Sequence, residues 1–119
     1  MRKGNFLVRL IINALAFLIV SAVYSGMKVN GLWAAIIAAL IWGIVNALLR
    51  PILMLLTLPI NFLTLGLFTL VINGIILLVT AQLYSGLVIS DFFSGIIAAI
   101  LLSVVNVILS LFLGKDEKK

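Results

Sequence analysis

The sequence predicts an all-α integral membrane protein with four transmembrane helices, built from two parallel two-helix repeats. Its composition, its four long apolar runs and a match between its two halves lead to this prediction. Hydrophobic residues make up 66% of the 119 residues and charged residues only 9%, whereas about a quarter of a soluble domain is charged. A small soluble domain buries only about 60–70% of its surface. So much apolar side chain therefore requires lipid as the surrounding solvent.

Four apolar runs have about the 20 residues that a spanning helix needs. They cover residues 6–24, 32–50, 61–84 and 92–113, and turn-forming residues such as Ser25, Gly31, Pro59 and Asp91 separate them. We treat residues 1–119 as one four-helix membrane domain.

The segment 51–59 between the second and third runs is too apolar for a solvated loop and too short to span. It either continues the second helix past a kink at Pro51 or forms a short interfacial helix. We favour continuation, with a turn near residues 57–59.

The basic residues predict the orientation, because cytoplasmic loops carry an excess of Lys and Arg. With an even number of spans, seven basic residues fall on one face and only Lys28 on the other; the seven are Arg2, Lys3, Arg9, Arg50, Lys115, Lys118 and Lys119. We therefore expect both termini in the cytoplasm, a short charged cytoplasmic tail at 114–119, and outward-facing hairpins at 25–31 and 85–91.

The two halves of the chain match at a constant offset of 60 residues, with units at about 7–50 and 67–110. Tyr24-Ser25-Gly26 recurs as Tyr84-Ser85-Gly86, and Ile36-Ile37-Ala38-Ala39 recurs as Ile96-Ile97-Ala98-Ala99. Each unit holds two spans, so both enter the membrane in the same direction, related by an axis along the membrane normal. The repeat is degenerate, because Asp91 and Ser110 stand where the first unit has Gly31 and Arg50.

The composition indicates that the chain is not an enzyme. It has no Cys and no His, and its only acids are Asp91, Asp116 and Glu117. We expect no catalytic residues, no metal ligands and no cofactor site. The net charge of +5 does not indicate nucleic-acid binding, because the basic residues lie at the ends of apolar runs and form no patch.

One Asn from each predicted helix is expected in the cytoplasmic third of the membrane; the four are Asn13, Asn46, Asn73 and Asn106. A buried amide in hydrocarbon needs a hydrogen-bond partner, so we expect an intramembrane polar layer where the helices converge. Its role is open between structural glue, at about 0.6–2 kcal/mol per interhelical bond, and a polar constriction on a permeation path.

Small residues recur at every fourth position on two predicted helices. The predicted packing faces are Ala35, Ala39 and Gly43 on the second helix and Gly95, Ala99 and Ser103 on the fourth. Such patterns allow close backbone approach, either within one chain or between copies. Arg9 and Arg50 fall at the cytoplasmic interface, where we expect orientation and contact with lipid phosphate.

Several segments carry a family resemblance, chiefly Asn46-Ala47-Leu48-Leu49-Arg50-Pro51 and Leu56-Thr57-Leu58-Pro59. With Leu10-Ile11-Ile12-Asn13-Ala14-Leu15, Gly31-Leu32-Trp33-Ala34-Ala35 and Leu65-Gly66-Leu67-Phe68, they resemble the mycobacterial-type four-transmembrane phage holin family, superfamily IV, also called YvlD-like membrane proteins. The resemblance implies a multi-pass protein of the bacterial cytoplasmic (inner) membrane and holin-type action through oligomeric lesions.

Three functional hypotheses follow, none of which includes a chemical step. The first is a holin-type protein that acts by helix packing or homo-oligomerisation in the lipid bilayer. The second is a small transporter or channel subunit with an Asn-lined path. The third is an accessory protein of envelope stress or lipid homeostasis that binds a membrane-protein partner or anionic lipid.

Overall fold

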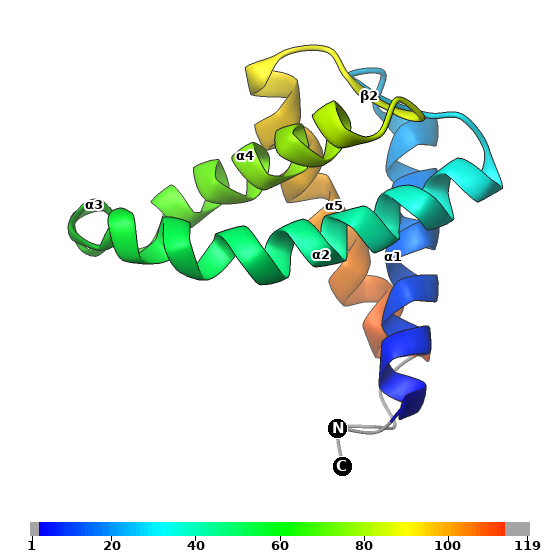
Figure 1. Ribbon diagram of the computed structural model, residues 1–119, viewed down its shortest axis with the longest axis horizontal. Coiled ribbons are helices and arrows are strands. Elements are labelled where there is room, and N and C mark those ends of the chain that lie inside the picture. The colour runs from blue at the N-terminus through cyan, green and yellow to red at the C-terminus, as the bar shows by residue number, and fades with distance from the viewer. Residues whose placement is uncertain (1–2, 114–119) are drawn as a thin grey trace.

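The computed structural model describes residues 3–113 of the chain, and the predicted charged tail at 114–119 lies outside them. The described part is mostly helical (Figure 1). In chain order its elements are α1 (Lys3–Val23), β1 (Met27–Val29), α2 (Leu32–Leu56), α3 (Leu58–Leu63), α4 (Phe68–Leu83), β2 (Leu87–Ile89) and α5 (Phe92–Leu113).

Helices α1, α2 and α5 are long and apolar enough to cross a membrane, and α4 is a shorter apolar helix. The predicted continuous third span over 61–84 is wrong, because that run contains the end of α3, a turn and α4. Helix α4 has 16 residues. At 1.5 Å per residue it is about 24 Å long, less than the roughly 30 Å hydrocarbon core.

The turn between α3 and α4 combines two residues of positive φ with hydrogen bonds from side chains. Leu65 and Gly66 have positive φ values of 59° and 88°, a region that ends a right-handed helix. The N–H of Gly66 donates to the carbonyl of Asn61 at 2.7 Å. The buried Asn61 amide also donates to the Thr57 hydroxyl at 3.0 Å and accepts from the Thr69 hydroxyl at 3.2 Å.

The preferred interpretation of segment 51–59 is confirmed. Helix α2 runs through Pro51 to Leu56, and Thr57 separates it from α3, in whose first turn Pro59 lies. The Thr57 hydroxyl donates to the carbonyl of Leu53 at 2.7 Å. The chain thus turns where the sequence placed the turn, and α3 extends the hairpin by one short helix.

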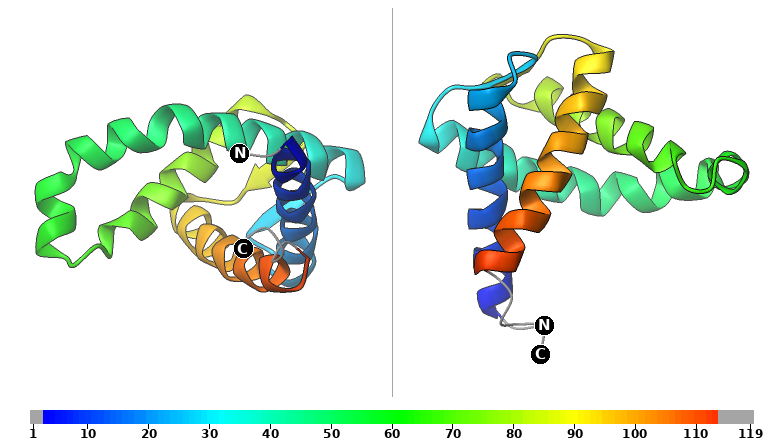
Figure 2. Two further views of the ribbon diagram at one scale, coloured as in Figure 1. Left: turned by 90° about the horizontal axis from the view of Figure 1, so that it is seen from below. Right: turned by 180° about the vertical axis from the view of Figure 1, so that it is seen from behind.

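Helices α1, α2, α4 and α5 form two arms that diverge from one corner (Figures 1 and 2). Helices α1 and α5 run side by side in the first arm, and α2 and α4 run side by side in the second. Near the corner α1 also packs on α2, and α4 packs on α5. The molecule therefore has a V shape, with α3 at the free end of one arm.

A two-stranded antiparallel ribbon, which the sequence analysis missed, closes the corner of the V. Lys28 lies opposite Val88 at its centre, and those positions are 60 residues apart. Two further hydrogen bonds extend the ribbon, from Asn30 N–H to the Gly86 carbonyl at 3.1 Å and from Ser90 N–H to the Gly26 carbonyl at 3.0 Å. Strands of three residues are too short to leave an alternating sequence pattern.

Helix α5 begins with a side-chain cap that α2 lacks. The carboxylate of Asp91 accepts the N–H of Ser94 at 2.8 Å, and hydrogen bonds from the Ser94 backbone and hydroxyl hold the pKa of Asp91 below its usual range. At the same position before α2 stands Gly31, with φ of 107° and no side-chain cap.

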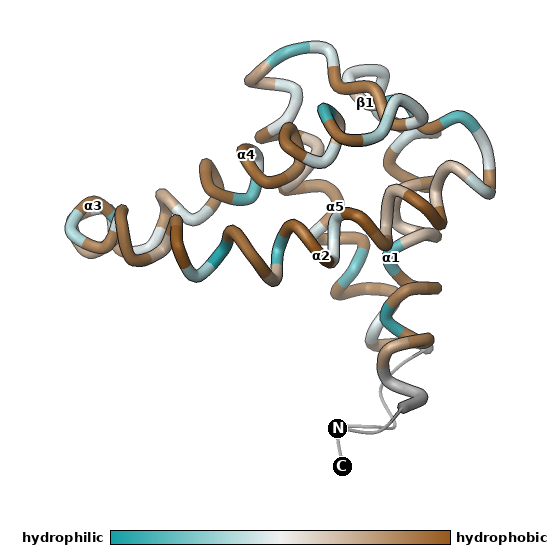
Figure 3. Tube along the Cα trace, in the orientation of Figure 1, coloured by the Kyte–Doolittle hydropathy of each residue, from teal (hydrophilic) through white to brown (hydrophobic). Residues whose placement is uncertain are grey.

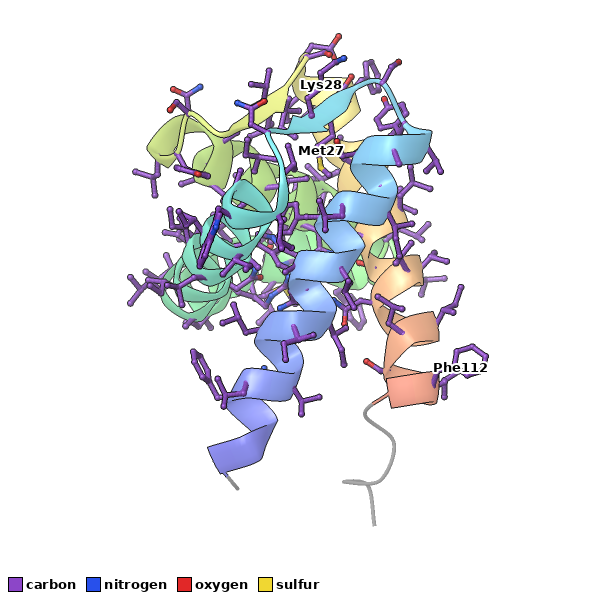
Figure 4. All side chains as sticks on the ribbon, turned by 90° about the vertical axis from the view of Figure 1, so that its right-hand side faces the viewer. Met27, Lys28 and Phe112 are labelled. Atoms are coloured by element: carbon purple, nitrogen blue, oxygen red, sulfur yellow. The ribbon has the colours of Figure 1, made fainter. Side chains whose placement is uncertain are left out.

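The best-packed core lies beside the ribbon, where all four long helices meet. Its fully buried large side chains include Phe17, Val20, Met27, Leu77, Leu87 and Leu102. Hydrophobic residues dominate the helices along their length (Figure 3), and many large ones are exposed, as Leu65 of the turn after α3 is at 92%. Figure 4 shows Lys28 at the ribbon end of the molecule and Phe112 at the opposite end. The exposed apolar faces are suited to lipid.

Candidate functional site

A polar cavity of about 560 Å³ is lined by residues of α1 and α5 in one arm and of α2 and α4 in the other, away from the ribbon. All four predicted Asn residues and both interfacial arginines line it. The complete lining is Arg9, Asn13, Trp42, Gly43, Asn46, Ala47, Arg50, Asn73, Ser103, Asn106 and Val107. The cavity lies within the range of about 300–1,000 Å³ typical of small-molecule sites.

In the first arm, a hydrogen bond between two amides joins α1 to α5. The Nδ2 of Asn106 donates to the Oδ1 of Asn13. Both side chains are half-buried. An amide facing hydrocarbon needs such a partner, so this bond holds the arm together at the level of the cavity.

In the second arm, Arg50 bridges the two asparagines. Its Nε and Nη2 donate to the Oδ1 of Asn46 at 3.2 and 2.9 Å, and Nη2 also donates to the Oδ1 of Asn73. The Nδ2 of Asn46 donates to the carbonyl of Trp42 at 2.9 Å. One guanidinium therefore joins α2 to α4.

The polar layer expected from the sequence thus takes the form of two hydrogen-bonded sets, one in each arm. The asparagines face a common cavity, but no hydrogen bond joins an Asn of one arm to an Asn of the other within residues 6–112. The reason is the V shape: it pairs α1 with α5 and α2 with α4 at this level and separates the pairs by the cavity.

Arg9 and Arg50 were expected at the membrane boundary, and their part in the cavity was not predicted. Both line it, Arg9 exposed and Arg50 half-buried. A signal was present, because Arg9 precedes Asn13 by four residues and Arg50 follows Asn46 by four. That spacing puts each pair on one helix face. No lining residue is acidic.

Aromatic packing closes the cavity toward the ribbon. Trp42 lines it, and its ring meets the fully buried ring of Phe17 edge to face, with centroids 5.5 Å apart. Beyond Phe17 lies the dry core, where Ala38 and Leu77 are fully buried. In this conformation the cavity ends in the core and does not continue to the other end of the molecule.

The predicted small-residue faces have two different environments. Ala35, Ala39 and Ala99 are buried in the core, and a Cβ on Gly95 would lie 2.8 Å from the side chain of Leu78 on α4. These four residues serve packing within one chain. Gly43 and Ser103 are exposed and line the cavity.

An apolar groove adjoins the cavity between α1 and α2. It has a volume of about 320 Å³ and shares Arg9, Asn13, Gly43 and Ala47 with the cavity. Its remaining lining is apolar: Phe6, Leu10, Ala39, Leu40 and Ile44. The polar space thus connects sideways to a surface suited to hydrocarbon.

Comparisons with known proteins support the assignment of the chain as a bacterial membrane protein. A family model described as "Mycobacterial 4 TMS phage holin, superfamily IV" matches residues 4–108. The chain is 37% identical to the uncharacterized membrane protein YvlD of Bacillus subtilis over 103 residues, covering 86% of this chain and 87% of that protein. It is 34% identical to the uncharacterized protein SCO3922 of Streptomyces coelicolor over 123 residues, covering 95% and 98%. No solved structure matches.

Proposed function

The chain belongs to the mycobacterial four-transmembrane phage holin family, superfamily IV, and from that premise we propose that it is a binding protein of the bacterial inner membrane. In this proposal the cavity between the arms takes up a ligand from the cytoplasmic side, and no chemical step follows. The family is of a non-enzymatic class.

We propose an orientation in which the ribbon faces outward and the open end of the V faces the cytoplasm. Lys28 lies at the ribbon, whereas Arg9 and Arg50 line the cavity between the diverging arms. This distribution follows the excess of basic residues on the cytoplasmic side. The pairing of Lys28 with Val88 supports the further proposal that units 7–50 and 67–110 are duplicates related by an axis along the membrane normal.

The observation that carries the binding role is a polar cavity with one closed end. Asn and Arg side chains are costly at membrane depth unless they contact water or partners. Since the packed core beyond Phe17 and Trp42 ends the cavity, its shape suits a site that is loaded and emptied from one side. A continuous path would be needed for permeation through a single chain.

Cysteine labelling tests this role cleanly, because the natural chain has no Cys. Three single-cysteine variants would be treated with a membrane-impermeant maleimide in inside-out and right-side-out vesicles. Ser103→Cys, in the cavity, should react only in inside-out vesicles. Lys28→Cys should react only in right-side-out vesicles, and the buried Ala98→Cys in neither.

Labelling of Ser103→Cys from both sides would favour a permeation path and overturn the binding role. Failure to label it from either side would mean that the cavity is not accessible from the cytoplasm, which would also overturn the proposal. Reversed labelling of Lys28→Cys would contradict the orientation alone.

A second candidate is assembly of the holin type, in which copies associate through the free part of the small-residue faces. Gly43 and Ser103 are exposed, and a Cβ on Gly43 would meet nothing within 4 Å. Overexpression should then collapse the membrane potential, and Gly43→Leu should abolish the collapse. The variant Ile52→Leu, on an exposed part of α2 outside the cavity, is the matched control. An unchanged potential on overexpression would rule out this candidate.

A further inference from the structure

We infer that the cavity binds the phosphate group of a membrane lipid, with a hydrocarbon chain of that lipid in the groove between α1 and α2. This inference rests on the proposed binding function and names the chemical class of the ligand. It is carried by the charge of the cavity, by the direction of its hydrogen bonds and by its connection to an apolar groove.

The charge of the cavity selects an anion. Arg9 and Arg50 both line it, and none of its lining residues is acidic. Asp91, the one carboxylate within residues 3–113, lies beside the ribbon at the start of α5. Guanidinium groups bind phosphate through paired N–H donors, and they lose less hydration in doing so than an ammonium group does.

Arg50 is held in place for such a contact. Its Nε and Nη2 are fixed by the amide oxygens of Asn46 and Asn73. Its Nη1 has no hydrogen-bond partner among the described side chains and backbone, so two N–H donors remain. A guanidinium already fixed by neutral acceptors keeps its full positive charge and loses little side-chain entropy when a ligand arrives.

Asn13 and Asn73 use their amide oxygens within the protein and leave their N–H groups over, whereas Asn106 donates one N–H to Asn13 and Asn46 donates one to the carbonyl of Trp42. The oxygens of Asn13, Asn46 and Asn73 all accept hydrogen bonds within the protein. Within residues 6–112 the NH₂ groups of Asn13 and Asn73 donate to no protein acceptor. An amide has two donors and one acceptor oxygen. The polar lining therefore presents mainly donors, which fits the acceptor oxygens of a phosphate.

The groove favours a lipid over a free ion. It shares Arg9 and Asn13 with the cavity, and the rest of its lining is apolar. Phe6, Leu40 and Ile44 of this groove are exposed on the surface that we assign to the bilayer. A lipid could therefore enter sideways between α1 and α2, with its phosphate at the arginines and its chain against these residues. Inorganic phosphate would leave the groove empty.

Tryptophan fluorescence offers a direct binding test. The chain has two tryptophans; Trp42 lines the cavity, and Trp33 is 75% exposed near the ribbon. In a Trp33→Phe background, full-length protein in non-ionic detergent would be titrated with dioctanoyl phosphatidic acid, dioctanoylglycerol or inorganic phosphate. We expect a saturable change in Trp42 emission with phosphatidic acid and at least tenfold weaker binding of the other two probes.

Variants separate the phosphate contact from general membrane affinity. Arg9→Gln should weaken binding of phosphatidic acid about tenfold or more, since it removes a charge-assisted contact. Arg9 makes no hydrogen bond within the described residues, so this variant should fold normally. Arg50→Lys keeps the charge but loses the paired donors and should also weaken binding. Lys28→Gln removes the same charge at the ribbon and should leave the affinity within about twofold.

Each other outcome is decisive. Equal affinity for inorganic phosphate would overturn the lipid assignment, and equal affinity for dioctanoylglycerol, or no effect of Arg9→Gln, would overturn the phosphate assignment. If Ser103→Cys is labelled from the cytoplasmic side yet phosphatidic acid does not bind, this inference fails while the binding cavity stands. If Ser103→Cys is not labelled, the proposed function itself fails.

Discussion

The first and second halves of the chain are alike beside the ribbon and differ at the other end. In both, the ring of a tyrosine lies over a glycine two residues on, Tyr24 over Gly26 and Tyr84 over Gly86. Away from the ribbon, Arg9 and Arg50 of the first half line the cavity, whereas the equivalent positions in the second half are Thr69 and Ser110 and do not. The ribbon end is therefore alike in both halves, whereas the charged residues of the cavity come from the first half alone.

The halves also differ in how closely their helices pack. Gly74 on α4 lies so near α5 that a Cβ there would be 2.9 Å from the Cα of Ile96. The equivalent residue in the first half is Ala14, which lines an apolar groove of about 220 Å³ between α1 and α2. The second half is therefore the tighter scaffold, and the first half carries the open surfaces.

The largest expected effect breaks that scaffold. Gly74→Ala should destabilise the protein by about 1–3 kcal/mol, because the new methyl group collides with backbone and must push α4 away from α5. Gly43→Ala is the control: it has open space around it and should stabilise α2 by up to about 1 kcal/mol. Unfolding in mixed detergent micelles measures both. Equal effects would show that the packing difference does not matter.

The amide pairs allow a second comparison, between the arms. Asn106→Ala removes the direct partner of Asn13 and should cost about 0.6–2 kcal/mol. Asn73→Ala should cost less, because Arg50 keeps its two hydrogen bonds to Asn46. The same unfolding assay compares them. A greater loss of unfolding free energy for Asn73→Ala would mean that the bridge through Arg50 holds its arm more strongly than the Asn106–Asn13 hydrogen bond holds the other.

The shared end should show a smaller difference. Gly26→Ala and Gly86→Ala both displace a tyrosine ring. Among the residues that the structure describes, the hydroxyl of Tyr24 has a partner, Ser94 at 3.3 Å, and that of Tyr84 has none. The position equivalent to Ser94 is Ala34. Gly26→Ala should therefore be the more destabilising by about 1 kcal/mol, and the Ser94→Ala background should remove the difference. A difference that persists in that background would assign it to another cause.

The smallest effect concerns the Asp91 cap of α5, which α2 lacks. Because hydrogen bonds lower the pKa of Asp91 in the folded protein, the folded state favours the ionised carboxylate. This stabilisation is complete above the unfolded value of 3.8 and disappears as the pH falls through the lower folded value. The difference in melting temperature between wild type and Asp91→Asn should therefore shrink as the pH is lowered from 6 toward about 3. A constant difference would contradict the cap.

The sequence predicted features that depend on runs of similar residues or on local signals. The first, second and fourth apolar runs became helices, and Thr57 and Pro59 marked the turn after α2. The turn at Leu65 and Gly66 was not predicted, because nothing in an apolar run indicates that one of its leucines has a positive φ.

The arrangement of the site depended on tertiary geometry. The four asparagines of the cavity were visible in the sequence, but which amides pair follows from the way α1 lies beside α5 and α2 beside α4. The divergence of the arms has no local signal either. Because the arms diverge, Arg50, which was expected to contact lipid, lines the cavity and joins α2 to α4 by hydrogen bonds.

Pro51 has one more consequence, for the oxygen one turn before it. In an unbroken helix the carbonyl of Ala47 would accept the N–H of residue 51, but proline has none. In hydrocarbon such an orphaned carbonyl costs several kcal/mol. Ala47 borders the polar cavity, where solvent can satisfy that oxygen. Solvent in the cavity would therefore reduce the cost of Pro51 to helix α2, and loss of that solvent would weaken the helix at this point.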